Sequence, residues 1–331
     1  MSARSILWLT WRQHRWAVGA VALLALGGAW ALFEGEDSRR QTGSMTMLGF
    51  HATVVQLAFG CVVGVVWGAP LVSRELEEGT YFVAWGQDVT PVQWLRGKVV
   101  VLGLLAAVLG AVIGIGDGYS GDPRWTWGLF EAFWALQAGY AVFGLALGVL
   151  VGLLSRHVVT AMAATLVLYT LVRVFTAVVV RDHLLPSVRS TTDWTSMPQV
   201  PPGALVLRTG FVDSDLDPVD VTAECRPYTA DSCMRSSGAA SGRYADFQPA
   251  DRIGLFQFLE LGLFLLLSAV LLAVAFRILR RSGGWKPSRS HRRITSDAAG
   301  PADPTDPTDP TDPTDPVDSS EPETAATRAE G

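Results

Sequence analysis

The chain contains 331 residues, of which 49% are apolar and 17% are charged. Soluble domains usually carry roughly 25% charged residues. The charge is also unevenly placed, because residues 296–331 hold ten of the 31 acidic residues and one of the 26 basic residues. The net charge of -5 therefore arises in this tail, and the rest of the chain is net basic. These values argue against a soluble enzyme.

Six long runs of the chain are almost free of charge. Each has about 18 to 25 residues, enough to cross a hydrocarbon core of roughly 30 Å as a helix. They are continuously apolar rather than alternating, which excludes a membrane β-barrel. The sequence therefore predicts an all-α polytopic membrane protein with six transmembrane helices: Trp16–Phe33, His51–Val72, Val99–Gly116, Phe133–Leu154, Val158–Val180 and Ile253–Ile278.

Glycines with a spacing of four occur inside two of these runs. Gly60 and Gly64 form one pair, and Gly144 and Gly148 form another. Small residues allow membrane helices to approach closely. Close packing within one bundle is favoured, and a dimer face is the alternative.

Basic residues predict the orientation of the spans. The N-terminus, residues 73–98, the link 155–157 and the start of the C-terminal region together hold 14 Lys and Arg residues, against three in the short segments of the other side. Cytoplasmic segments are enriched in Lys and Arg. We therefore expect a cell-membrane protein with both termini cytoplasmic and the loop 181–252 outside.

The regions between and after the spans differ in character. The external loop is rich in polar residues and has one β-like stretch around Ala204–Leu207. Cys225 and Cys233 lie in this loop, where a disulfide can persist; two unpaired thiols are the alternative. In the tail 282–331, residues 301–316 repeat Asp-Pro every three residues, which predicts an extended, disordered cytoplasmic segment.

Two cytoplasmic segments carry aromatic residues. Ser5–Trp16 combines tryptophan with arginine, which favours an interfacial helix on the lipid bilayer over nucleic-acid binding. In Ser73–Lys98, residues 74–78 and Pro91–Lys98 predict two short helices, the second with Thr90 as its N-cap. This segment is interpreted either as a solvated loop or, because of its four aromatic residues, as a docking surface.

Motifs for catalysis are missing from the sequence. No G-x-x-x-x-G-K-[ST] loop occurs, so nucleotide binding of the P-loop type is not expected. No H-E-x-x-H or G-x-S-x-G pattern occurs either. We expect no enzyme activity, no metal and no cofactor in this chain. A transport or scaffold bundle of this kind would take its energy from another protein.

Two opposite charges interrupt the fifth and sixth runs. Arg173 lies seven residues before the end of the fifth, and Glu260 lies seven residues after the start of the sixth. At 1.5 Å per residue both lie about 10 Å below the outer boundary. Since an unpaired charge at that depth costs a few kcal/mol, we predict a direct or water-bridged ion pair. The alternatives are separate snorkelling to the interface, or a polar cavity facing Glu260.

Several segments resemble the type-2 ABC transporter permeases, the membrane subunits of ABC exporters, in their actinobacterial branch. The resemblance covers residues 5–281, the predicted transmembrane permease domain within 1–281. It rests on the loop-and-span layout and on these motifs: Trp11-Arg12-Gln13-His14-Arg15, Ser73-Arg74-Glu75, Glu78-Gly79-Thr80, Trp85, Thr90-Pro91-Val92, Trp94, Lys98, Phe247-Gln248-Pro249-Ala250-Asp251-Arg252, Gln257 and Glu260.

The resemblance implies a permease subunit of an ATP-driven exporter. A second permease subunit and separate ABC ATP-binding subunits would be its partners, with ATP bound by the latter. In such permeases the loop equivalent to 73–98 relays closure of the ATP-binding subunit to the spans. This implies a coupling role for Arg74, Glu75, Glu78, Gly79, Thr80, Trp85, Trp94 and Lys98. The alternative is a non-transporting membrane scaffold or sensor that acts through its external loop, and an intramembrane enzyme is a more remote third.

Overall fold

The structure is a computed structural model that describes residues 3–42, 46–79, 90–115, 127–194, 196–220, 225, 230–238 and 240–281. All of these belong to one compact unit, Met1–Gly283. The predicted tail 282–331 lies outside the described residues, as do Thr80 and Trp85.

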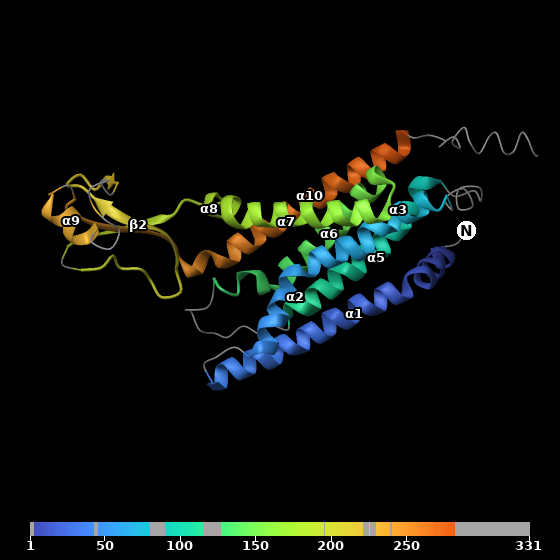
Figure 1. Cartoon of the computed structure of the whole chain (residues 1–331), viewed down its shortest axis with the longest axis horizontal. Helices are drawn as coiled ribbons and strands as arrows, with labels where there is room; N and C mark the ends of the chain where they lie inside the picture. The colour runs from blue at the N-terminus through green and yellow to red at the C-terminus, as the bar shows by residue number, and fades with distance from the viewer. Residues whose placement is uncertain are drawn as a thin grey trace, which may run out of the picture. The chain divides into compact units, whose positions relative to one another are not determined.

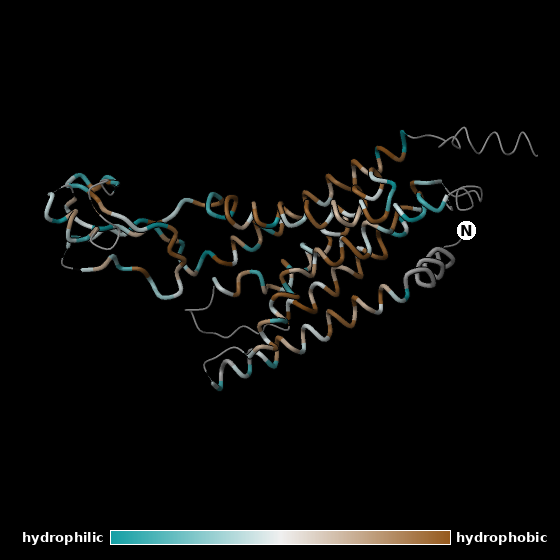
Figure 2. The backbone as a smooth tube through the Cα atoms, in the orientation of Figure 1, coloured by the Kyte–Doolittle hydropathy of each residue, from teal (hydrophilic) through white to brown (hydrophobic). Residues whose placement is uncertain are grey.

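Six helical segments are long and apolar enough to cross a membrane (Figure 1). They are Arg15–Gly35, Met47–Glu77, Pro91–Ile115, Trp134–Ser155, Val158–His183 and Ala250–Arg281. Each predicted run falls on one of them, and the prediction of six apolar helices is confirmed. Hydrophobic residues dominate these helices, whereas the β-strands carry more hydrophilic ones (Figure 2).

The spans are built from α-helices that π-helical turns join in two places. The helices are α1 (Ala3–Thr42), α2 (Met47–Val63), α3 (Ala69–Glu77), α5 (Pro91–Ile115), α6 (Trp134–Ser155), α7 (Val158–Phe175), α8 (Arg181–His183) and α10 (Ile253–Arg281). The π-helical turn η1 (Gly64–Gly68) joins α2 to α3, and η4 (Thr176–Val180) joins α7 to α8. The 3-10 turns η3 (Phe130–Ala132) and η6 (Ala250–Arg252) precede α6 and α10.

Three sequence-based boundaries are corrected by the structure. Ser5–Trp16 is not a separate interfacial helix, because α1 continues through it without a break. Residues 74–77 are the end of the second span rather than a short helix, and Pro91–Lys98 is the first part of α5. Charged residues thus extend these helices beyond the apolar runs, because a helix ends where its backbone geometry changes and not where hydropathy falls.

Helix α6 is the most buried of the spans and packs against α2, α3, α5, α7 and α10. Its glycines explain how the second span comes so close. A Cβ atom built on Gly144 would lie 1.9 Å from the carbonyl oxygen of Gly60, and one on Gly148 would lie 2.3 Å from that of Gly64. The two glycine pairs therefore face each other within one bundle, as the first of the two interpretations proposed.

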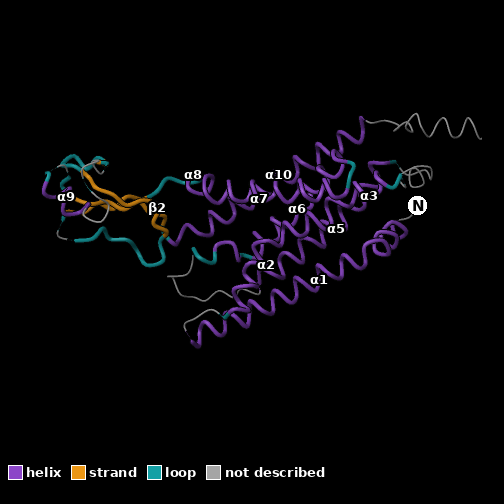
Figure 3. Tube along the Cα trace, in the orientation of Figure 1, coloured by secondary structure: helices purple, strands orange, loops and turns teal. Residues whose placement is uncertain are grey.

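The segment predicted as a loop contains a small antiparallel sheet, with strands β1 (Val188–Asp193), β2 (Leu205–Val212), β3 (Pro218–Val219) and β4 (Gly242–Gln248) in the order β1-β4-β2-β3 (Figure 3). The β-like stretch from the sequence lies at the start of β2. The other strands were missed because they present little apolar pattern, as in the polar Val188–Asp193, where half-buried and exposed residues alternate.

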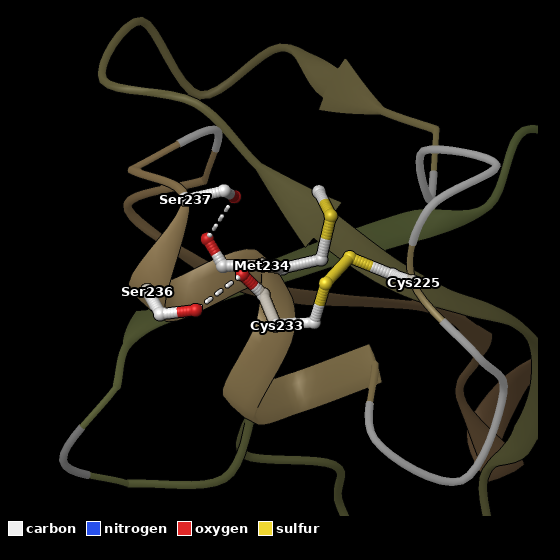
Figure 4. Close-up of a disulfide and its surroundings, with 5 residues drawn as sticks. All are labelled: Cys225, Cys233, Met234, Ser236 and Ser237. Carbon is white, nitrogen blue, oxygen red and sulfur yellow. Dashed lines mark hydrogen bonds between the residues drawn. A yellow bond between two sulfur atoms is a disulfide. The ribbon is translucent and has the colours of Figure 1, made fainter.

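A disulfide between Cys225 and Cys233 lies in this segment, as expected from the sequence (Figure 4). Cys233 belongs to the short helix α9 (Ala230–Ser236). Ser236 and Ser237 donate hydrogen bonds to the carbonyl oxygens of Cys233 and Met234 at 3.0 and 3.1 Å. Together with Phe211 and Ala240, Cys225 and Met234 form a separate small core.

Candidate functional site

The first candidate site is a set of contacts around the end of α3, which we name the inner linkage: Glu75, Glu77, Lys98 and Val158. Lys98 is only 2% exposed. Its ammonium forms a salt bridge with the Glu75 carboxylate and lies 4.4 Å from the centre of the Trp94 ring. A buried ammonium needs such partners, because an unpaired buried charge is costly. The pair therefore fixes α3 to the start of the third span.

Thr90 and Gln93 hold the beginning of that span. The Thr90 hydroxyl accepts the backbone N–H of Gln93, and the Gln93 side chain accepts the backbone N–H of Thr90, both at 3.3 Å. This reciprocal capping box satisfies two N–H groups that a helix start leaves free. The predicted N-cap at Thr90 is confirmed.

Glu77 makes the second connection of the inner linkage. Its Oε2 accepts the backbone N–H of Val158 at 2.8 Å, at the first residue of α7. A carboxylate is favourable there because helix N-termini carry partial positive charge. Sequence reasoning did not select Glu77. A usable signal existed, since the residue before α7 is His157 and not one of the Ser, Thr, Asp or Asn residues that usually cap a helix start.

The other predicted coupling residues are more peripheral. Arg74 and Glu78, the C-cap residue of α3, form an exposed ion pair of 2.8 Å at the end of this helix. Gly79 ends the helix with φ of 67°, a conformation that favours glycine. These residues present a charged, solvent-facing surface next to the buried pair.

The second candidate site is a cluster of four charged side chains near the opposite end of the helices, which we name the charge quartet: Glu131, Arg173, Arg181 and Glu260. Arg173 donates to Glu131 Oε2 at 2.6 Å and to Glu260 Oε1 at 3.3 Å. Arg181 donates to Glu131 Oε1 at 3.0 Å, and to Glu260 Oε2 and Oε1 at 3.0 and 3.1 Å. The Arg173–Glu260 contact expected from their depths is present.

Aromatic rings complete the surroundings of the quartet. The Tyr140 hydroxyl donates to Glu260 Oε1 at 2.6 Å, and the Arg173 guanidinium lies 3.6 Å from the centre of the Tyr140 ring. The Arg181 guanidinium lies 4.2 Å from the Phe130 ring. Glu260 is 0% exposed, so its charge is balanced entirely by these donors. Two positive and two negative charges leave the quartet neutral, which lowers the cost of burying it.

The π-helical turn η4 brings the two arginines to one face of the fifth span. Arg173 and Arg181 are eight residues apart, which in a regular α-helix separates them by ~80° around the axis. A π-helical turn takes up about one extra residue, so their separation falls to roughly 20°. Both guanidinium groups can therefore reach the same two carboxylates.

Sequence reasoning found half of the quartet. Arg181 was assigned to the external loop, which is corrected here because Arg181 lies in the span Val158–His183. Glu131 lies just before the fourth predicted run, Phe133–Leu154, and the structure places it in η3. Within the described part of the chain, no group of three or more His, Cys, Asp or Glu side chains is suited to hold a metal ion.

Comparison with known proteins finds a family match that runs from the end of the first span to near the end of the fifth. Residues 35–181 match the family described as ABC-2 membrane transporter related. Searches among curated proteins and among solved structures found no match. The matched range contains the whole inner linkage, together with Glu131, Arg173 and Arg181 of the quartet.

Proposed function

We propose that this chain, whose residues 35–181 match the family described as ABC-2 membrane transporter related, is a permease subunit of an ATP-driven exporter in the cell membrane. ATP would be bound and hydrolysed by separate ABC subunits, and a second permease subunit, identical or different, would complete the path. Both termini would be cytoplasmic, which places the inner linkage on the side of the ATP-binding partner.

The inner linkage is the observation that supports this proposal best. Three spans meet there: α3 ends the second, Lys98 lies near the start of the third, and Val158 starts the fifth. A push on the exposed surface of α3 at Arg74 and Glu78 would reach all three through short polar contacts. A closing ATP-binding subunit needs such a connection to change the arrangement of the spans.

A second function, that of a membrane sensor or scaffold, is favoured by one observation. The external segment is a folded sheet with a disulfide rather than an extended loop. A folded external unit is suited to binding. The two functions differ in whether a partner ATPase acts on the chain.

The test uses the purified full chain in lipid nanodiscs, with and without the ATPase encoded by a neighbouring gene. We expect no ATP hydrolysis by the chain alone. With the partner, ATP should alter amide hydrogen exchange at the outer starts of α6 and α10. Hydrolysis by the chain alone, or an unchanged exchange pattern in an assembled complex, would contradict the exporter proposal.

The variant Glu75→Gln tests the route of coupling. It leaves Lys98 without its carboxylate, so the partner should still bind while the ATP-driven change in exchange is lost. Glu34→Gln, an exposed position in α1, is the matched control and should behave as wild type. If ATP changes the hydrogen exchange of both variants equally, the inner linkage does not take part in coupling.

A further inference from the structure

A hollow of about 440 Å³ lies where the fifth span gives way to the external sheet. Its polar lining comes from three places: Asp182 and His183 of α8, Ser187 before β1, and Arg208 and Asp246 of the sheet. None of these residues belongs to the inner linkage or to the charge quartet.

The sheet places a row of three charges beside this hollow. Asp246 of β4 is the register partner of Arg189 on β1 and of Arg208 on β2. Arg189 occupies both carboxylate oxygens of Asp246, with Nε to Oδ1 at 2.7 Å and Nη2 to Oδ2 at 2.9 Å. Arg189 alone thus binds both oxygens of the Asp246 carboxylate. The three residues together carry one positive charge in excess.

Arg208 carries that excess charge. Among the described residues Arg208 forms no salt bridge, and its side chain is exposed at the hollow. The hydrogen bonds from Arg189 lower the pKa of Asp246, so Asp246 stays ionised and is not available as a proton donor. A guanidinium without a carboxylate of its own, next to hydroxyl and imidazole groups, is suited to a phosphate.

The position of the hollow along the chain limits the source of that phosphate. The span Val158–His183 ends at the residues that line it, so the hollow lies at the level of lipid headgroups. His183 Nδ1 lies 2.7 Å from the carbonyl oxygen of Val179 and must donate to it. The Nε2 of His183 is therefore the ring nitrogen that remains for contact with a ligand. Asp182 supplies a negative charge that forms no salt bridge among the described residues and can attract an ammonium group.

We propose that this hollow binds a phosphodiester that also carries an ammonium group, with Arg208 at the phosphate and Asp182 at the ammonium. A lipid headgroup of the outer leaflet and a soluble glycerophosphodiester share this chemistry. The proposal rests on the external sheet and the end of the fifth span, and it does not depend on the transport function.

The experiment compares the two sources on the full-length chain. Soluble glycerophosphoethanolamine is titrated by calorimetry into the delipidated protein in a phosphate-free detergent. In parallel, native mass spectrometry counts the phosphatidylethanolamine that remains bound after transfer from mixed micelles. Binding in the calorimetric titration would show that the soluble diester is sufficient. Binding in the mass-spectrometric experiment alone would show that the intact lipid is the ligand.

Three variants make the result specific. Arg208→Gln should weaken binding about tenfold or more, as expected for a lost charge-assisted hydrogen bond. Asp182→Asn should remove the preference for phosphatidylethanolamine over phosphatidylglycerol. Arg235→Gln, an exposed arginine of α9 in the same external segment, is the control and should bind as wild type. Absence of binding in both arms, or equal binding by Arg208→Gln and wild type, would overturn the proposal.

Discussion

Glu77 accepts the backbone N–H of Val158 at 2.8 Å and so joins the last turn of α3 to the first turn of α7, across 81 residues of sequence. The neighbouring Glu75 binds Lys98 on α5. Two carboxylates of one helical turn thus connect the ends of three spans. Neither contact follows from hydropathy, because both depend on which helices are neighbours.

The Glu77 contact predicts a graded response to substitution. Glu77→Ala removes the acceptor and should lower the unfolding free energy by ~0.5–2 kcal/mol, the range for a lost N-terminal cap. Glu77→Gln keeps an acceptor oxygen and should lose less. Thermal unfolding in detergent measures the loss, and hydrogen exchange at the first turn of α7 localises it. Equal effects of the two variants would contradict the role of the side-chain oxygen.

The sequence sufficed for the six spans because membrane crossing depends on local composition. It also brought Arg173 and Glu260 together, since two residues equally distant from the same boundary lie at equal depth in antiparallel helices. The other half of the quartet was not predictable in this way. Arg181 reaches the carboxylates only because η4 changes the face on which it lies, and π-helical turns have no simple sequence signature.

The quartet predicts strong coupling between its members. Glu260→Gln and Arg173→Gln each break a buried ion pair and should each lower the unfolding free energy by about 3–5 kcal/mol. The double variant should lose less than the sum, because the second change removes a charge that the first left unpaired. Unfolding in detergent measures all three. Additive losses would make the two residues independent.

Glu131 provides an internal comparison within the same cluster. Its side chain is 20% exposed, whereas that of Glu260 is fully buried. Water can replace part of its interactions, so Glu131→Gln should cost less than Glu260→Gln. The reverse order would show that burial does not set the energetics of this cluster.

The close approach of α2 and α6 predicts that glycine positions differ sharply in how well they tolerate substitution by alanine. A Cβ at Gly144 would overlap the carbonyl oxygen of Gly60 at 1.9 Å, so Gly144→Ala should destabilise the protein by about 1–3 kcal/mol or more. Gly103 is the matched control, because its Cβ would meet only Leu145 at 3.7 Å. Gly103→Ala should be neutral or slightly stabilising. Melting temperatures in detergent distinguish the two.

The pair Arg189–Asp246 predicts that the four-stranded sheet is sensitive to acid. The folded-state pKa of Asp246 is lowered, first by the hydrogen bonds from Arg189. Its stabilising contribution is therefore complete above the ordinary aspartate pKa of about 4 and is lost as the pH falls through the lower, folded-state value. Near-ultraviolet circular dichroism of the external aromatic residues can follow this loss. In Asp246→Asn the acid transition of this pair should be absent.

The four-stranded sheet shows why contacts between distant segments could not be predicted from the sequence. Arg189 and Arg208 flank Asp246 only through the strand order β1-β4-β2-β3, in which neighbours in space are far apart along the chain. The cysteine pair was accessible from the sequence because its two members are close together in the chain and belong to the same polar segment between two spans. Strands with polar outer faces give no comparable signal.

The π-helical turn η1 lets the second span hold one residue more than a regular α-helix of the same helical phase. Removing one residue from Gly64–Gly68 would restore regular α-helical winding and leave Glu75 and Glu77 on the face that meets Lys98 and Val158. Removing one residue from α3 before Glu75 would instead rotate both carboxylates by ~100° about the axis, although both side chains remained. A single-codon deletion should therefore be tolerated in the turn and should disrupt the contacts of both glutamates a few residues later.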